Sequence, residues 1–150
     1  MAEESLHLLC MLWADEGTIE QDGNIYYLKL KRINQKVLYS TSRPKKVRGY
    51  IESNHFIFVW SQNNDAFDAE PAEIAMSYSN LSKNKYGISN AIAANLSNPT
   101  LTKDGCVFNL KWRDEKVSLG TYKDIALFID WLPTTYCPKP ISLLMPHFFD

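Results

Sequence analysis

The stretch TIEQDGNIYYLKLK, residues 18–31, shows most plainly how this chain folds. At its centre, Asp22-Gly23 separates two apolar runs. This dipeptide is a strong hairpin signal, because glycine adopts a positive φ at little cost. In the second run Tyr26, Leu28 and Leu30 fall on one face, and polar or tyrosyl residues occupy the positions between them. A period of two is typical of a strand with one buried face, so the stretch predicts a β-hairpin.

The same signals recur along the chain. A second Asp-Gly pair, Asp104-Gly105, introduces a run whose one face holds Cys106, Phe108, Leu110 and Trp112. Apolar runs also predict short strands at 5–14, 37–39, 74–78, 116–119 and 125–129, with a turn at 15–17. Many short strands separated by turn residues predict a mainly β fold, either an antiparallel β-sandwich or an open barrel of about eight strands.

One segment has the period of a helix. Ser53 or Asn54 can cap it, and Phe56, Val59 and Trp60 then fall at positions i, i+3 and i+4. We therefore expect one short helix near 53–61. The Ala-rich run 88–96 also has the propensity of a helix, and Asn98-Pro99 is expected to end it.

Bulk composition is that of a globular protein. The 150 residues, 45% of them hydrophobic and 22% charged, suit a single domain over 1–150 with a buried core. Four prolines predict an irregular C-terminal tail from about residue 132. No apolar run approaches the roughly 20 residues that span a bilayer. Glu3 and Glu4 stand where an export signal carries basic residues, so we expect a chain that is cytoplasmic or already trimmed of such a signal.

The three cysteines are Cys10, Cys106 and Cys137. Their number is odd and their spacing is wide, which predicts buried free thiols and argues against a disulfide framework or a zinc site. The three histidines are scattered, and the chain has no nucleophile elbow and no phosphate-binding glycine loop. We therefore expect no catalytic centre, no metal and no cofactor.

Charge is distributed in blocks. Residues 1–22 contain six acids and no base, residues 29–48 contain eight bases and no acid, and residues 49–82 contain five acids and no base. One interpretation is structural: the basic block pairs with acidic segments on adjacent strands. The other is a site for an anion, with the candidate ligand-binding residues Tyr39, Arg43, Lys45, Lys46, Arg48 and Tyr50. Nucleic acid is an unlikely partner, because the acidic blocks repel phosphates.

Arg43 has a second interpretation. It precedes Pro44 among small residues, and a buried arginine at such a bend requires a carboxylate partner. A structural clamp is the stronger expectation for Arg43, with the partner drawn from Asp68, Glu70 and Asp130.

Three functions follow from these residues. The leading one is a non-enzymatic binding module for a protein or a small anionic ligand around residues 39–60. The first alternative is a hydrolase-type enzyme that uses carboxylates of the 65–73 loop with Arg43. The second is a structural or accessory domain without a ligand.

The order of landmarks resembles a family of bacterial β-rich domains, mostly exported and without an assigned activity. That family carries Tyr-x-x-Asp-Arg-Pro, a Gly five residues after the Pro, then Phe and Trp, followed by Phe-Ala-x-Asp-Pro-Pro, Asn-Pro-x-Leu-x-x-Asp and Leu-Phe-Ile-Asp. The matching positions lie between 37 and 130: Tyr39, Arg43, Pro44, Gly49, Phe56, Trp60, Phe67, Pro71, Asn98, Pro99, Leu101, Asp104, Gly105 and 127–130.

Two positions depart from this pattern, since Ser42 and Glu70 stand where the family has Asp. A role of the family aspartate in chemistry or metal binding is therefore in doubt here. The resemblance implies a mostly β domain and leaves secretion by a bacterium open. It implies no particular activity.

Overall fold

The computed structural model describes residues 7–43, 46–62, 72–81, 83–87, 91–113 and 116–131. These residues form one helix, α1 (Ser53–Gln62), and eight antiparallel strands: β1 (His7–Asp22), β2 (Ile25–Ile33), β3 (Lys36–Arg43), β4 (Val47–Glu52), β5 (Ala72–Ser77), β6 (Ile92–Leu101), β7 (Gly105–Trp112) and β8 (Gly120–Trp131). The mainly β prediction and the helix near 53–61 are confirmed. The tail predicted from about 132 lies outside the described residues.

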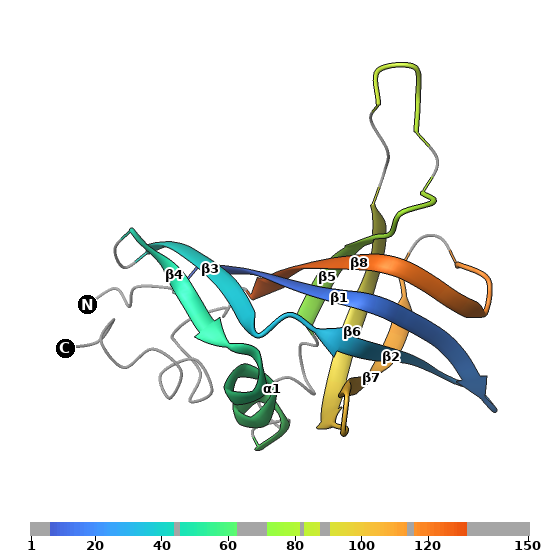
Figure 1. The fold of residues 1–150 in the computed structure, drawn as a ribbon, viewed down its shortest axis with the longest axis horizontal. Coiled ribbons are helices and arrows are strands. Elements are labelled where there is room, and N and C mark those ends of the chain that lie inside the picture. The colour runs from blue at the N-terminus through green and yellow to red at the C-terminus, as the bar shows by residue number, and fades with distance from the viewer. Residues whose placement is uncertain are drawn as a thin grey trace.

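Six of the strands close into a barrel (Figure 1). The order β2-β7-β6-β5-β8-β1 returns to its start, because β1 also pairs with β2. Of the two predicted architectures the chain therefore adopts the barrel, and its ring of hydrogen bonds is closed. Closure removes the unpaired strand edges that an open sheet exposes.

The long strand β1 organises this barrel. One of its edges pairs with β8 from Leu8 to Ile19. The opposite edge is shared: β3 pairs with its first residues and β2 with residues 14–22. The hairpin of β3 and β4 consequently lies outside the closed ring, where it extends the sheet beyond β1 (Figure 1).

The prediction of a turn at residues 15–17 is wrong, because β1 continues through these residues. Ala14 and Gly17 both face the interior, and the two residues between them both point outward. In the neighbouring strands the ladders skip Arg32 and Asp124, which have φ values of 55° and 52°. At this level the side-chain alternation reverses in three strands at once, while both ladders keep their register. We call this level of the barrel the corner.

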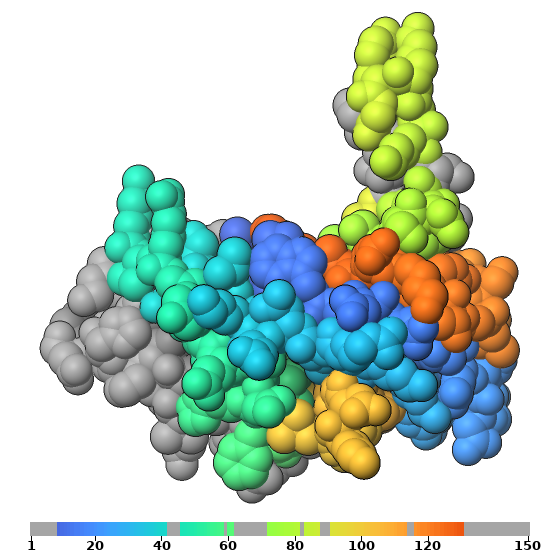
Figure 2. Space-filling view, in the orientation of Figure 1, coloured from blue at the N-terminus to red at the C-terminus, as the bar shows by residue number. Residues whose placement is uncertain are grey.

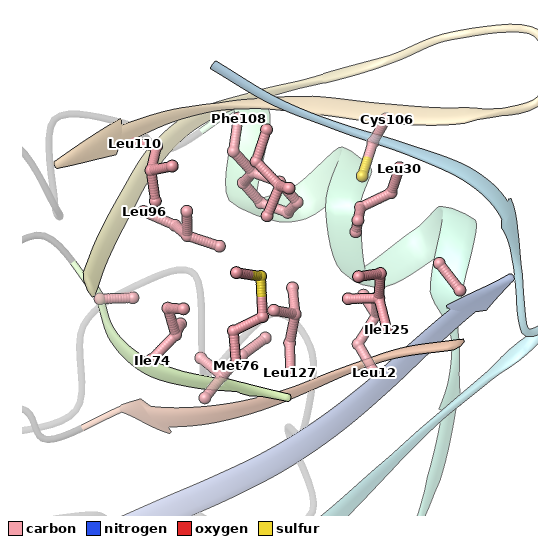
Figure 3. Close-up of a cluster of buried hydrophobic side chains, with 14 of the residues drawn as sticks. Leu12, Leu30, Ile74, Met76, Leu96, Cys106, Phe108, Leu110, Ile125 and Leu127 are labelled. Atoms are coloured by element: carbon pink, nitrogen blue, oxygen red, sulfur yellow. The ribbon is translucent and has the colours of Figure 1, made fainter. Parts of the chain in front are cut away.

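Hydrophobic side chains from the barrel strands fill its interior (Figure 3). The members labelled there are Leu12, Leu30, Ile74, Met76, Leu96, Cys106, Phe108, Leu110, Ile125 and Leu127. Helix α1 adds Phe56, Ile57 and Trp60 to the same cluster, all fully buried. The Trp60 ring lies 5.2 Å from that of Phe108, between ring centroids. One helical face therefore completes the core of the barrel.

The helix predicted over 88–96 is wrong for its described part, and residues 88–90 lie outside the described residues. Residues 92–101 form β6 between β5 and β7, and Ile92, Ala94 and Leu96 are buried with a period of two. Nor does Asn98-Pro99 end this element. The β6–β7 register shifts between Ser97 and Thr100, so the proline lies in a bulge, where a missing N–H is tolerated. The strand predicted at 116–119 is irregular chain before β8.

Candidate functional site

The candidate site lies on the hairpin of β3 and β4. Burial alternates along both strands, and the cross-strand pairs Lys36–Glu52, Leu38–Tyr50 and Ser40–Arg48 all share the outward side. We call this surface, together with Lys46 at the start of β4, the hairpin outer face. Its opposite side packs on the core through Val37, Tyr39, Val47 and Ile51.

An apolar pair lies at the centre of the hairpin outer face. Leu38 is 44% exposed and Tyr50 is 57% exposed. The Nζ atom of Lys36 lies 4.3 Å from the centroid of the Tyr50 ring, which is a cation–π contact. Arg48 and Lys46 are exposed beside them. In Figure 2 this hairpin, in teal, projects from the body of the molecule.

The basic residues of the block 29–48 fall into two groups. Two of the three on β2 pair with acids of β1, as the structural interpretation predicts: Lys29 with Glu20 at 2.8 Å, and Arg32 with Asp15 at 3.1 Å. The third, Lys31, has no ion pair among the described residues. By contrast, no carboxylate among the described residues lies within ion-pair distance of Lys36, Lys46 or Arg48. Local ion pairing therefore does not explain the positive charge of the hairpin outer face.

Tyr39 is separated from this face. It lies half-buried on the inner side of the hairpin, where its ring crosses Gly49: a Cβ built at Gly49 would be 3.0 Å from the Tyr39 hydroxyl oxygen. Pairs of this kind are sheet-stabilising contacts. Of the predicted ligand-binding residues with described side chains, the structure brings together Lys46, Arg48 and Tyr50 on one surface and places Tyr39 elsewhere.

Arg43 ends β3 opposite His7 of β1, and Asp130 of β8 pairs with Leu9 on the other edge of β1. The backbones of the two proposed clamp partners thus lie at the same end of the sheet. The side chain of Arg43, and residues Lys45, Asp68 and Glu70, lie outside the described part of the chain. The clamp and the hydrolase alternative therefore stay predictions. Glu73, at the end of the 65–73 loop, pairs with Arg113.

A pocket of about 420 Å³ opens at the base of the hairpin. Its lining residues are Ile33, Gln35, Lys36, Tyr50, Glu52, Ser53 and Asn54. Ser53 begins α1, and its backbone N–H donates to the Gln35 carbonyl at 2.9 Å. The first turn of α1 contains no acid, so the positive end of the helix dipole adds to the charge of Lys36.

Lys36 and Leu38 are the residues that sequence reasoning missed. The alternation that places Arg48 and Tyr50 outward on β4 also identifies them, once β3 is paired with β4 in the register observed.

The two described cysteines and His55 are the thiols and the imidazole to consider for nucleophilic chemistry. Cys10 and Cys106 are buried free thiols, as predicted. Burial raises the pKa of both thiols, that of Cys106 to about 12, which disfavours the reactive thiolate. His55 is exposed on α1. Within the described ranges, no three His, Cys, Asp or Glu residues are placed to hold a metal ion.

In the part of the chain that the structure describes, no helix has the length and apolar character to cross a membrane. Comparison of the chain with protein-family models, with curated proteins and with solved structures finds no match. The resemblance to exported bacterial domains therefore stays a prediction, and a function has to be argued from the geometry of this chain.

Proposed function

We propose that this protein is a non-enzymatic binding module, and that an acidic segment of a partner protein binds the hairpin outer face. The observation that carries the proposal is the exposed Leu38–Tyr50 pair, surrounded by Lys36, Lys46 and Arg48, which have no ion-pair partner among the described residues. Tyrosine and arginine are enriched where proteins bind one another, and unpaired surface charge selects a partner of opposite sign.

The position of the hairpin supports this proposal. In the described structure β4 is the last strand of the sheet order and pairs only with β3, whereas the barrel strands are paired on both sides. An extended peptide that crosses the hairpin outer face can contact Leu38 and Tyr50 with an apolar side chain. Its flanking carboxylates then reach the three basic residues, so the expected recognition sequence is acidic with an apolar anchor.

A small anion in the basal pocket is the second candidate. Lys36 and the start of α1 favour it, because both present positive charge to one space. The carboxylate of Glu52 lines the same pocket and opposes it. The peptide is therefore the first choice, and the small anion becomes an outcome of the test.

The test is a selection of displayed random peptides on the whole chain, followed by calorimetric titration of one enriched peptide. We expect enriched peptides to be rich in Asp and Glu around an apolar or aromatic residue. The double variant Lys36→Ser/Tyr50→Ser should weaken binding about tenfold or more, since it removes an anchor and a charge.

A matched control exists in the same chain. Lys85 and Tyr86 form another lysine–tyrosine contact, at 5.1 Å, in the connection between β5 and β6, and Tyr86 is 75% exposed. Lys85→Ser/Tyr86→Ser makes the same chemical changes and should leave binding intact. Equal loss in the two double variants would contradict the proposed surface. If the chain binds inorganic phosphate and no peptide is enriched, the small-anion site in the basal pocket replaces the proposed peptide surface.

A further inference from the structure

A second pocket, of about 540 Å³, lies at the corner of the barrel. It is lined from three adjacent parts of the sheet by Trp13, Ala14, Asp15, Arg32, Asn34, Asp124 and Ile125. Its volume is in the range of small-molecule sites. It shares no lining residue with the pocket at the base of the hairpin, so it has to be considered separately from the proposed function.

The polar groups of this corner pocket are fixed by their neighbours. The Arg32 Nε atom donates to Asp15 Oδ2 at 3.1 Å, and its Nη2 atom lies 3.7 Å from Glu16 Oε1. Glu16 in turn accepts a hydrogen bond from Lys123. On the far side, Asn34 Oδ1 accepts from the Lys36 backbone N–H at 2.9 Å, which leaves the Asn34 amide NH₂ group as a donor.

The corner explains why these side chains meet. The positive φ at Arg32 and at Asp124 belongs to the level where the side-chain alternation reverses, so it is not itself a sign of a ligand. Its consequence is that charged side chains of three strands point outward at one level. Among the described residues, the carboxylate of Asp124 has no hydrogen-bond or ion-pair partner, and both of its oxygens can accept.

The charges of the pocket narrow the class of ligand. Two carboxylates, Asp15 and Asp124, disfavour an anion, and the guanidinium of Arg32, which is paired with Asp15, disfavours a cation. A neutral ligand with several hydroxyl groups fits better, because each hydroxyl both donates and accepts. Trp13 is half-buried and lines the pocket, and an indole offers an apolar surface to the C–H face of a ring.

We propose that the corner pocket binds a saccharide unit. Trp13 packs on the apolar face of the sugar ring. Asp15 and Asp124 accept hydrogen bonds from its hydroxyl groups, and Arg32 and Asn34 donate to its oxygens. The site is open and has one aromatic residue, so we expect millimolar affinity for a single unit, as for ligands that make few buried contacts.

The experiment is a nuclear magnetic resonance titration of the ¹⁵N-labelled whole chain. The probes are the methyl glycosides of glucose, galactose, mannose and N-acetylglucosamine. For at least one of them we expect saturable shifts of the backbone amides of residues 13–15, 32–34 and 124–125, together with the Trp13 indole N–H. Absence of shifts for all four, or shifts that map elsewhere, would overturn the proposal, as would calcium chloride producing the same shifts in place of the glycosides.

Variants make the test specific. Trp13→Ala should weaken binding about tenfold, the effect expected for a lost ring contact of about 1.4 kcal/mol. Asp124→Asn should weaken it several-fold without refolding the corner, because Asn tolerates a positive φ. Asp22→Asn, at the exposed far end of β1, is the matched control and should bind as the wild type does. Equal effects of Asp124→Asn and Asp22→Asn would contradict the site.

The two proposed sites can fail separately. The hairpin variant Lys36→Ser/Tyr50→Ser should bind the glycoside normally, and Asp124→Asn should bind the acidic peptide normally. If the hairpin variant no longer binds the glycoside, that result contradicts the corner pocket but does not contradict the proposed peptide surface.

Discussion

At the scale of the residue, the two Asp-Gly pairs serve different purposes. Gly23 has a φ of 62° in the turn between β1 and β2, and a Cβ at this position would meet no atom within 4 Å. Gly105 begins β7, where a Cβ would lie 1.9 Å from the carbonyl oxygen of Leu30. The first glycine is required by its own backbone conformation, and the second by the approach of another strand.

We predict that Gly105→Ala and Gly23→Ala differ sharply in stability. Gly105→Ala forces β2 and β7 apart and should cost about 3–5 kcal/mol or prevent folding. Gly23→Ala adds only the strain of a left-handed residue, about 1–2 kcal/mol. Urea denaturation followed by circular dichroism measures both. Similar costs for the two variants would show that β2 and β7 do not approach as described.

At the scale of the element, α1 matters through its buried face. Phe56 and Trp60 are fully buried, and their ring centroids lie 6.0 Å apart. Phe58, on the same helix, is 51% exposed. The helix therefore contributes to the barrel core from one side only. Because so short a helix is marginal on its own, its stability depends mainly on that contact.

We predict that Trp60→Ala lowers the free energy of unfolding by about 3–5 kcal/mol, the usual cost of deleting a large buried ring. Phe58→Ala, the control on the exposed side, should change it by no more than about 0.5 kcal/mol. Equilibrium denaturation gives both values. A larger effect at Phe58 would mean that the helix packs in another orientation.

The corner gives a prediction about pH. The hydrogen bond from Lys123, opposed in part by desolvation and reinforced by the charges of Lys123 and Arg32, lowers the pKa of Glu16. A carboxyl whose pKa is lowered in the folded state stabilises the fold above its unfolded pKa, and this contribution disappears as pH falls through the folded value. Glu16→Gln should therefore reduce the melting temperature at neutral pH and have little effect at an acidic pH below the folded pKa of Glu16.

Glu20→Gln is the control for this measurement. The Glu20 side chain is 49% exposed in its pair with Lys29, against 17% for Glu16, so its removal should change stability less. An effect of Glu16→Gln that is the same at both pH values would exclude the ion pair as its cause.

How far the sequence predicts these elements depends on how local each signal is. The helix at 53–62 shows its own period, and the turn at Gly23 needs only its own residues. Strand β6 cannot be predicted from its own residues, because Ala93 and Ala94 favour a helix. It forms a strand because it pairs with β5 and β7. Residues 15–17 are likewise strand and not turn, because they lie between the ladders that β1 makes with β2 and β8.

The candidate site divides in the same way. Arg48 and Tyr50 are visible in the local charge pattern, but Lys36 and Leu38 join them only through the β3–β4 register. The side of the sheet on which Tyr39 lies also follows from that register. The corner pocket was not predictable at all, because its residues come from positions 13–15, 32–34 and 124–125.

At the scale of the whole molecule, a closed barrel carries two projections (Figure 2). One is the β3–β4 hairpin and the other is the connection between β5 and β6, which stands out as an arm in yellow-green. The described barrel strands are paired on both sides, and the ion pairs of β1 join it to its neighbours β2 and β8. Three bases without an ion pair among the described residues, Lys36, Lys46 and Arg48, lie with an exposed apolar pair on the hairpin, so we expect binding there, with the barrel as its rigid support.

The most direct measurement is amide chemical-shift mapping of the ¹⁵N-labelled chain with one selected acidic peptide, at low and at high salt. We predict saturable shifts confined to residues 36–40 and 46–54, with affinity that falls as salt rises, because the contacts join exposed opposite charges. Shifts that map to the barrel strands away from the hairpin, or affinity that does not change with salt, would contradict the account.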